Sequence, residues 1–256
     1  MRRHLVAGIR MLVILTLLLG VIYPLTVTGI SQLTMSHRAN GSLVRSDGAV
    51  VGSELINGAG SLIAEKLGTV RCAVIADSNI ADLFAPALEQ SLNKSGIQPI
   101  LFRVPAGEES KSLEQVGMIC ERMLAAALDR QSLVIGLGGG VVGDISGFVA
   151  AIFQRGIPHV QIPTTLLAMV DSSIGGKTGV NTSAGKNLLG VIHHPLMVID
   201  DINLLRTLPQ REFKQGYAEI IKHGIIADAE MFEELNSIQA SLLQPSDFDG
   251  QTLAPL

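Results

Sequence analysis

The sequence contains no tryptophan, two cysteines and few aromatic or charged residues: aromatic residues fill 4% of its 256 positions and charged residues 16%. Without tryptophan for base stacking or a basic stripe, and with a formal net charge of −4, no nucleic-acid partner is expected. Cys72 and Cys120 lie far apart in apolar segments, which argues against a disulfide framework or a cysteine-type zinc site and predicts two buried thiols. With no sign of a nucleic-acid partner, a small molecule is the expected partner. The hydrophobic content of 47% is ample for a buried core.

The N-terminal segment is also short of charge, because no Asp, Glu, Lys or Arg occurs from Met11 to His37. A membrane-spanning helix needs about 20 apolar residues, so this stretch predicts an N-terminal transmembrane helix. Arg2, Arg3 and Arg10 on its N-terminal flank would keep that end cytoplasmic and send the following residues across the membrane. A cleaved signal peptide is the main alternative, although no small-x-small cleavage site follows, and a buried helix of a soluble protein is a further one.

This segment resembles the N-terminus of the C subunit of the Kdp potassium-transporting ATPase. The resemblance is carried by residues 21–30, 39–44 and 50–56. It predicts that residues 1–56 are a membrane anchor segment. The soluble domain of that subunit has no counterpart after Ile56, but a membrane-anchored accessory protein of a potassium pump remains the non-enzymatic alternative.

Beyond Gly58, short β-branched runs alternate with longer amphipathic ones. This alternation is typical of a parallel sheet covered by helices, so we expect an α/β fold with a Rossmann-like parallel sheet and flanking helices over residues 57–212. The expected strands are residues 71–76, 99–104, 132–137, 159–163 and 196–200, and the expected helices are residues 80–95 and 113–128. A long connection rich in Gly, Ser and Asn joins the last two strands, and such loops are usually functional.

Glycines follow the third of these strands in the run Gly138-Gly139-Gly140-Val141-Val142-Gly143-Asp144. A helix-like stretch comes next, so backbone N–H groups and a helix N-terminus can face a pyrophosphate without an intervening Cβ. Ligands of a doubly wound sheet bind outside the carboxyl ends of its strands. The pattern therefore predicts a dinucleotide site at this turn.

Other polar residues follow neighbouring strands and are expected in the same cleft. Asp77 and Asn79 suit ribose hydroxyls, but they equally suit an N-cap of the next helix. Glu108 and Lys111 could contact a cofactor or form a capped, solvated turn, and the residues alone favour the turn.

The loop from Asp171 to Lys186 offers a second kind of site. Its Gly175-Gly176-Lys177-Thr178 looks like the end of a P-loop, but the earlier glycine that a P-loop requires is missing, which argues against an ATPase. Cationic and amide side chains among glycines can approach a phosphorylated, hydroxyl-rich substrate closely, and here they are Lys177, Asn181, Lys186 and Asn187. A solvated surface loop is the alternative.

Two further clusters could suggest a metal. Glu219 shares a helix face with Lys222 and His223, and a surface ion pair is the simpler interpretation of that spacing. His193 and His194 are adjacent in an extended loop and have no third ligand spaced nearby, so no metal is expected there.

Taken together, residues 56–235 resemble 3-dehydroquinate synthase. The segments that carry the resemblance are residues 105–112, 138–144, 154–156, 163–181, 185–187, 207–209 and 217–224. The resemblance implies a lyase of the shikimate pathway that converts a seven-carbon phosphorylated keto-acid sugar to 3-dehydroquinate and phosphate. It also implies catalytic use of NAD and a divalent metal, zinc or cobalt.

By position, the resemblance implies a role for each of several residues. The implied NAD contacts are Asp77, Asn79, Glu108, Lys111, Gly140, Val141, Val142, Gly143, Asp144, Thr164, Thr165, Lys177, Lys186, Leu204, Leu205, Arg206 and Thr207. The implied substrate or catalytic residues are Asp171, Lys177, Asn187 and Lys222, with Arg155 reaching the site of a partner subunit in a homodimer, and Glu219 is the implied metal ligand.

The chain also departs from the family pattern. The family's metal site takes two histidines from a C-terminal helical domain, of which residues 213–256 would be a truncated start, so a fusion or truncated product with little or no synthase activity is expected. The resemblance places the synthase-like part in the cytoplasm, whereas the anchor's charges would export it. An NAD-dependent polyol or alcohol dehydrogenase and another sugar-phosphate cyclase are the alternative enzymes.

Overall fold

The computed structural model describes residues 49–68 and 70–237, which belong to one compact unit. The predicted membrane anchor and the tail from residue 238 lie outside the described residues. Within them, no helix combines the length and the apolar character needed to cross a membrane.

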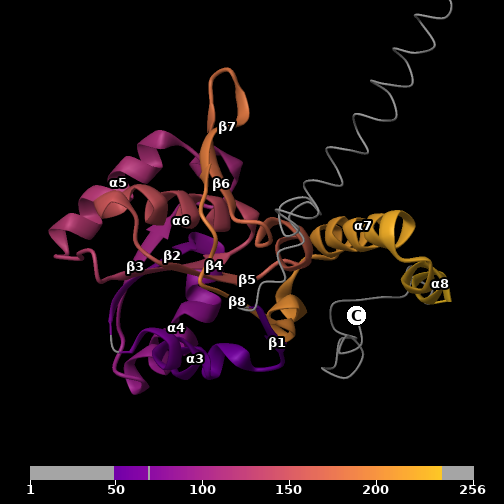
Figure 1. The fold of residues 1–256 in the computed structure, drawn as a ribbon, viewed down its shortest axis with the longest axis horizontal. Helices are drawn as coiled ribbons and strands as arrows, with labels where there is room; N and C mark the ends of the chain where they lie inside the picture. The colour runs from indigo at the N-terminus through magenta and orange to yellow at the C-terminus, as the bar shows by residue number, and fades with distance from the viewer. Residues whose placement is uncertain (1–48, 69, 238–256) are drawn as a thin grey trace, which may run out of the picture. The chain divides into compact units, whose positions relative to one another are not determined.

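A six-stranded parallel sheet forms the centre of the described unit, in the order β1-β8-β5-β4-β2-β3 (Figure 1). Its strands are β1 (Ala49–Gly52), β2 (Arg71–Asp77), β3 (Gln98–Val104), β4 (Leu133–Gly138), β5 (His159–Pro163) and β8 (Met197–Asp201). From β2 the chain moves outward to β3 and then returns to β4 on the other side of β2. Such a reversal of strand order opens the crevice in which doubly wound sheets bind ligands. The expected Rossmann-like parallel sheet with flanking helices is confirmed.

Helices cover both faces of the sheet (Figure 1). One face carries α3 (Ala59–Leu67) and α4 (Ser78–Lys94), and the other carries α5 (Leu113–Ala125) and α6 (Gly140–Ile152). Successive strand residues point to opposite faces, so Val74 and Ile135 pack under α3 and α4, whereas Ile75 and Val134 pack under α5 and α6. Short 3-10 helices complete this part of the chain: η2 (Leu55–Asn57), η3 (Glu108–Ser110), η4 (Phe153–Arg155) and η6 (Ile202–Thr207).

A close approach of α6 to the sheet fixes the helix start near the strand ends. A Cβ on Gly136 would lie 2.8 Å from the Ser146 Oγ, so only glycine lets α6 pack this tightly on β4. The helix therefore begins directly above the end of β4, where the expected nucleotide turn is located.

Residues 49–56 join the sheet although the sequence placed them in the anchor segment. β1 pairs in parallel with β8, and the buried Asp201 carboxylate accepts hydrogen bonds from the amides of Glu54 (3.0 Å) and Ile56 (2.9 Å). The α/β unit thus includes residues on the N-terminal side of position 57.

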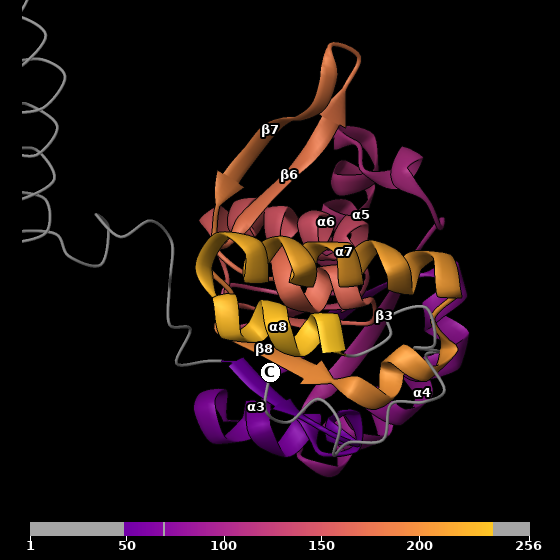
Figure 2. The same ribbon diagram turned by 90° about the vertical axis from the view of Figure 1, so that its right-hand side faces the viewer.

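The long connection between β5 and β8 was expected to be an irregular loop, and this expectation was wrong in part. Its middle forms an antiparallel hairpin of β6 (Lys177–Thr182) and β7 (Gly185–Ile192), preceded by the π-helix η5 (Ala168–Ser172). The hairpin projects from the α6 side of the sheet (Figures 1 and 2). β7 is exposed along nearly its whole length, which is why it lacks the alternation of buried and exposed residues that indicates a strand in a sequence.

The last described elements are α7 (Gln210–Ala227) and α8 (Ala229–Ser237), seen side by side in Figure 2. The predicted helix over residues 217–224 is confirmed. The apolar cluster beneath these helices includes Leu166, Phe213, Ile220 and Leu235. A Cβ on Gly216 would lie 2.5 Å from the backbone nitrogen of Leu167, so α7 packs directly on the segment that follows β5.

Candidate functional site

The turn between β4 and α6 presents backbone amides that no side-chain cap bonds. Gly139 is the N-cap of α6 and has no side chain to cap the first turn, where Gly140, Val141 and Val142 supply the N–H groups. A helix N-terminus with free amides attracts anions such as a pyrophosphate. The geometry is the one that the glycine pattern predicted.

Thr164 and Thr165 lie beside this turn. The Thr164 amide donates to the Gly138 carbonyl (3.0 Å), and a Cβ on Gly139 would lie 3.1 Å from the Thr165 Cγ2. The Thr164 Oγ1 is buried and has no hydrogen-bond partner among the residues the structure describes. The expected threonines and glycines are therefore brought together.

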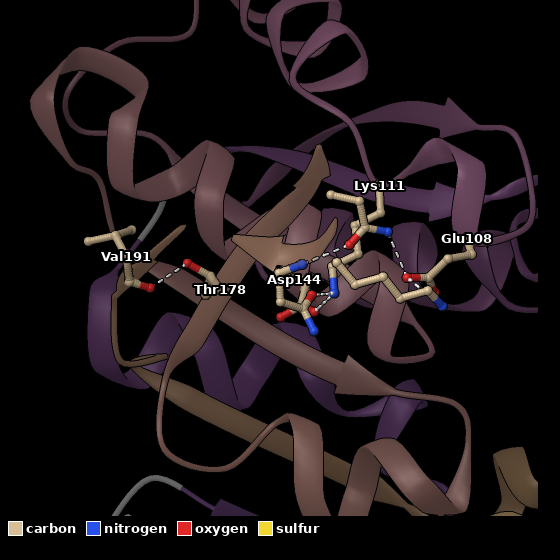
Figure 3. Close-up of polar contacts among 8 residues, drawn as sticks. Glu108, Lys111, Asp144, Thr178 and Val191 are labelled. Carbon is tan, nitrogen blue, oxygen red and sulfur yellow. Dashed lines mark hydrogen bonds and ion pairs between the residues drawn. The ribbon is translucent and has the colours of Figure 1, made fainter. Parts of the chain in front are cut away.

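Lys111 is the centre of a polar network that joins three segments (Figure 3). Its side chain is only 6% exposed, and its ammonium contacts the carboxylate of Asp144, in the first turns of α6, and the Oδ1 of Asn187, in β7. A buried ammonium must be paired in this way to be tolerated. Lys111 thus links two other residues, Asp144 and Asn187, that the resemblance assigned to NAD or substrate.

Asn181 extends the network to Glu108. Its Nδ2 donates to the Glu108 Oε1 (2.7 Å), its Oδ1 accepts from the Asn187 amide (3.0 Å), and its own amide donates to the Lys111 carbonyl (2.8 Å). Lys186 lies 3.6 Å from the same Glu108 oxygen. We call this group of six residues the clasp: Glu108, Lys111, Asp144, Asn181, Lys186 and Asn187.

The clasp shifts the titration of its two carboxyl groups in opposite directions. The hydrogen bond from Asn181 lowers the pKa of Glu108, and Lys111 and Lys186 lower it further. Burial raises the pKa of Asp144, and the bond from Lys111 offsets part of that rise. Both directions follow from the local environment: the more exposed carboxylate is hydrogen-bonded and the more buried one is desolvated.

A pocket of about 550 Å³ lies between α6, η5 and the hairpin. Its polar walls come from Asp144, Asp171, Lys177 and Asn187, all predicted site residues. The hairpin contributes a wall of exposed apolar side chains that includes Leu188 and Ile192. Thr178 fixes the hairpin register here, because its hydroxyl donates to the Val191 carbonyl (2.9 Å; Figure 3).

Other predicted residues lie apart from the clasp. Asp77 at the end of β2 is the N-cap of α4 and accepts from the amides of Asn79 (2.9 Å) and Ile80 (3.1 Å), so the capping interpretation is confirmed, and a ribose role remains a prediction. Leu204 and Leu205 are buried in apolar clusters, whereas Arg206 and Thr207 are exposed.

Arg155 is exposed on η4 and has a left-handed backbone (φ 69°). Its predicted reach to a partner subunit stays a prediction.

The expected metal ligand, Glu219, contacts residues of its own helix. Its carboxylate pairs with the Lys222 ammonium and lies 3.6 Å from the His223 Nε2. No group of three or more His, Cys, Asp or Glu residues that could hold a metal ion occurs within residues 49–68 and 70–237. The described residues therefore do not fit a catalytic zinc, which takes three protein ligands.

His193 and His194 were set aside as metal ligands in the sequence, and the structure shows the contacts that they make instead. The His193 ring stacks on His159 with centroids 4.9 Å apart, and its Nε2 donates to the Ile157 carbonyl (3.0 Å). His159 is fully buried, and desolvation, together with the nearby His193 and His194, lowers its pKa to about 3.

The sequence did not single out every residue of this region. Asn181 stood out only as one amide in the polar loop, and Thr178 and Ser172 as parts of a motif. A Cβ on Gly140 would lie 3.0 Å from the Ser172 Oγ, which places that hydroxyl at the nucleotide turn. Only the hairpin register and the packing of η5 bring these side chains to the site.

Two family models match separate parts of the chain. Residues 101–215 match the N-terminal domain of 3-dehydroquinate synthase, and residues 5–63 match the c chain of the K⁺-transporting ATPase. The second match reaches into the α/β unit, because it includes β1 and the start of α3.

Curated relatives are named 3-dehydroquinate synthase. The protein of Rhizobium rhizogenes is 48% identical over 188 residues (73% of this chain and 50% of the relative), and that of Symbiobacterium thermophilum is 50% identical over 184 residues (72% and 51%). The chain thus spans about half the length of the curated relatives it matches.

Solved structures of two other synthases and of a dehydrogenase are also similar to this chain. A 2-epi-5-epi-valiolone synthase from Streptomyces hygroscopicus with NAD⁺ and Zn²⁺ is 35% identical, with a TM-score of 0.69 over 76% of this chain and 53% of its own. A 2-deoxy-scyllo-inosose synthase complexed with carbaglucose-6-phosphate, NAD⁺ and Co²⁺ is 30% identical, with a TM-score of 0.66 over 70% and 48%. An iron-containing alcohol dehydrogenase is 18% identical, with a TM-score of 0.58 over 69% and 52%, which shows the fold alone.

Both resemblances expected from the sequence are therefore confirmed: residues 101–215 are similar to the N-terminal domain of 3-dehydroquinate synthase, and residues 5–63 are similar to the c chain of the K⁺-transporting ATPase.

Proposed function

We propose that this chain binds NAD at the β4–α6 turn and belongs to a 3-dehydroquinate synthase-type lyase. The single observation that supports this most is the uncapped glycine start of α6, flanked by two threonines and by the clasp. The similar cyclases are described with NAD⁺ bound, and relatives 46–50% identical are named 3-dehydroquinate synthase. The dehydrogenase alternative has support only from the fold, at 18–19% identity.

The residues at the turn suit the parts of NAD. The first-turn amides of α6 would bind the pyrophosphate, and the carboxylates of Asp77 and Glu108 would accept bonds from ribose hydroxyls. NAD, when bound, supplies the reversible oxidation of a substrate hydroxyl. The clasp would hold Asp144 and Asn187 in fixed positions beside that chemistry.

The pocket under the hairpin would receive the phosphorylated sugar-acid. Lys177 supplies a cationic donor for its anionic groups, and Asp171 and Asn187 supply acceptors and donors for its hydroxyls. The exposed apolar side chains of the hairpin, Leu188 and Ile192 among them, would pack against the carbon skeleton of the substrate. Elimination of phosphate and closure of a carbocycle from this substrate is the activity we propose for the intact enzyme.

Calorimetric titration of the full chain with NAD tests the nucleotide site. Gly140→Val is expected to weaken NAD binding about tenfold or more, because the new side chain would stand in front of the first-turn amides and against Ser172. Gly117→Val is the matched control, since this exposed helical glycine has open space around its Cβ position. Equal affinities of the two variants would contradict the proposed site.

Titration with NAD in the presence of a chelator tests whether nucleotide binding depends on a metal ion. Because Glu219 and His223 are too few ligands for zinc, NAD affinity of the chain is expected to be unchanged by EDTA. The titration is repeated with and without the chelator, at constant ionic strength. A loss of NAD binding on chelation would show that a metal supports the nucleotide site.

We also propose that the segment resembling the ATPase c chain anchors the protein in a membrane and that the synthase-like unit works as a homodimer. The charge-free run from Met11 to His37 supports the first proposal. Alkaline carbonate extraction of membranes tests it, because an anchored chain stays in the pellet. Sedimentation of the detergent-solubilised chain measures the oligomeric state.

A further inference from the structure

Asn181 connects three chain segments that each carry a proposed site residue. Its side-chain amide bonds Glu108 in η3 and the backbone of Asn187 in β7, while its backbone bonds Lys111. Ser112 and Asn181 also form an isolated β-bridge, so the end of β6 runs alongside the chain after η3. Lys111 also bonds both residues, through its backbone amide to the Glu108 carbonyl (3.1 Å) and through its ammonium to Asn187. Among the described clasp residues, Asn181 differs because its side chain hydrogen-bonds the Glu108 carboxylate and Asn187 together.

Each bond of Asn181 uses a different chemical property of the amide. The Nδ2 can only donate, and it meets a carboxylate that can only accept; the Oδ1 accepts from a backbone N–H. Neither a carboxylate nor a hydrocarbon of the same size could make both bonds. The choice of asparagine is therefore chemically specific.

The bond to Asn187 matters because that residue is conformationally unusual. Its φ of 57° lies in the left-handed region, which a non-glycine residue adopts at a cost unless its surroundings hold it there. The Asn181 Oδ1 holds its amide, and the side chain of Asn187 then accepts from the buried Lys111. The position of Asn187 in the pocket thus depends on Asn181.

We propose that Asn181 is a positioning residue of the nucleotide and substrate site, acting through Glu108 and Asn187. The residues that line the pocket include Asn187 but not Asn181, so Asn181 acts indirectly, by holding residues that do face the pocket. This inference rests on the proposed NAD site for its effect on binding. Its effect on Glu108 is independent of any ligand.

A polarity swap tests the role in NAD binding. Asn181→Asp keeps the Oδ1 acceptor but sets a carboxylate against Glu108, and it is expected to weaken NAD binding about tenfold. In the double variant Asn181→Asp with Glu108→Gln, the glutamine amide can donate to the new carboxylate and restore the bond in reverse. The double variant is therefore expected to bind NAD as well as Glu108→Gln alone.

The matched control is Asn93→Asp, the same chemical change at an exposed position of α4. Unfolding of every variant is measured in urea, so that a loss of fold is separated from a loss of positioning. If Asn181→Asp weakens NAD binding equally in the wild-type and Glu108→Gln backgrounds, coupling through Glu108 is absent and the inference fails.

The second readout is the Glu108 carboxyl, followed by NMR as a function of pH without NAD. The hydrogen bond from Asn181 is the main cause of its lowered pKa, so Asn181→Ser is expected to move that pKa upward, and Asn93→Ser is expected to leave it in place. An unmoved Glu108 pKa overturns the inference. Absence of NAD binding by the wild-type chain, with the pKa shift present, would overturn the proposed function instead.

Discussion

Replacing Asp201 by alanine is expected to lower the free energy of unfolding by about 3–5 kcal/mol, because it leaves buried amides without acceptors. The carboxylate is fully buried at the end of β8, where it accepts from the amides of Glu54, Ile56 and Asn203. Two of those amides follow β1, so the loss of stability should be greatest at the edge of the sheet that β1 forms. Urea unfolding gives the energy, and hydrogen exchange of residues 49–57 shows where it is lost.

Asp228→Ala is the control for this substitution. Asp228 also accepts two amide bonds, from Glu230 and Met231, but it does so at the exposed start of α8. Removal of an exposed N-cap costs about 1 kcal/mol, because water replaces the lost acceptor. An Asp201→Ala effect no larger than that of Asp228→Ala would mean that β1 is not held by Asp201.

The second large effect is on the pH dependence of the free energy of unfolding, to which the buried His159 and Asp200 contribute with opposite signs. His159 has a pKa of about 3 in the folded chain, below the ordinary value of 6.5, so folding disfavours its charged form and stability falls as pH drops below 6.5. Burial raises the pKa of Asp200 to about 7 from an ordinary value of 3.8, so stability falls as pH rises from 3.8 towards 7. Between about pH 4 and pH 6.5 the two contributions largely cancel.

Single substitutions should expose each contribution. In His159→Phe the ring keeps its stacking on His193 but cannot be protonated. When the pH falls from 7.5 to 4.5, the free energy of unfolding of this variant should therefore rise by about 3 kcal/mol relative to that of the wild type. Over the same fall in pH, the free energy of unfolding of Asp200→Asn should decrease by a similar amount relative to wild type, since this variant lacks the carboxyl group whose contribution opposes that of His159. Urea unfolding at both pH values measures this, and the difference between the two values removes the packing cost of each change. Parallel pH profiles for all three proteins would contradict the assigned environments.

The central fold was predictable from the sequence because its signals are local. The run from Leu133 to Gly138 is apolar and is followed at once by glycines and a helical stretch, so strand, turn and helix each have their own indication. Parallel strands place their carboxyl ends at one edge, so the site's location followed as well. Asp144, Asp171, Lys177 and Asn187 indeed line one pocket.

The clasp and the hairpin could not be predicted in the same way. β7 is exposed along nearly its whole length and contains two glycines, so its sequence lacks the period-two alternation of apolar and polar residues that indicates a strand. The bond from Asn181 to Glu108 joins residues 73 positions apart, and it exists only because the hairpin register sets Asn181 beside η3. Likewise β1 adds to the sheet through Asp201, 147 residues from Glu54. Such contacts arise from tertiary packing, which no local pattern encodes.

The nucleotide site is tested most directly by NMR of the full chain, with backbone amide shifts recorded as NAD is added. The largest shifts are expected at Gly140, Val141 and Val142, with smaller ones at Thr164 and Thr165, because these groups surround the free start of α6. The amides of α3, on the opposite face of the sheet, are expected to stay in place. Saturable shifts confined to α3, or none at the α6 turn, would contradict NAD binding there.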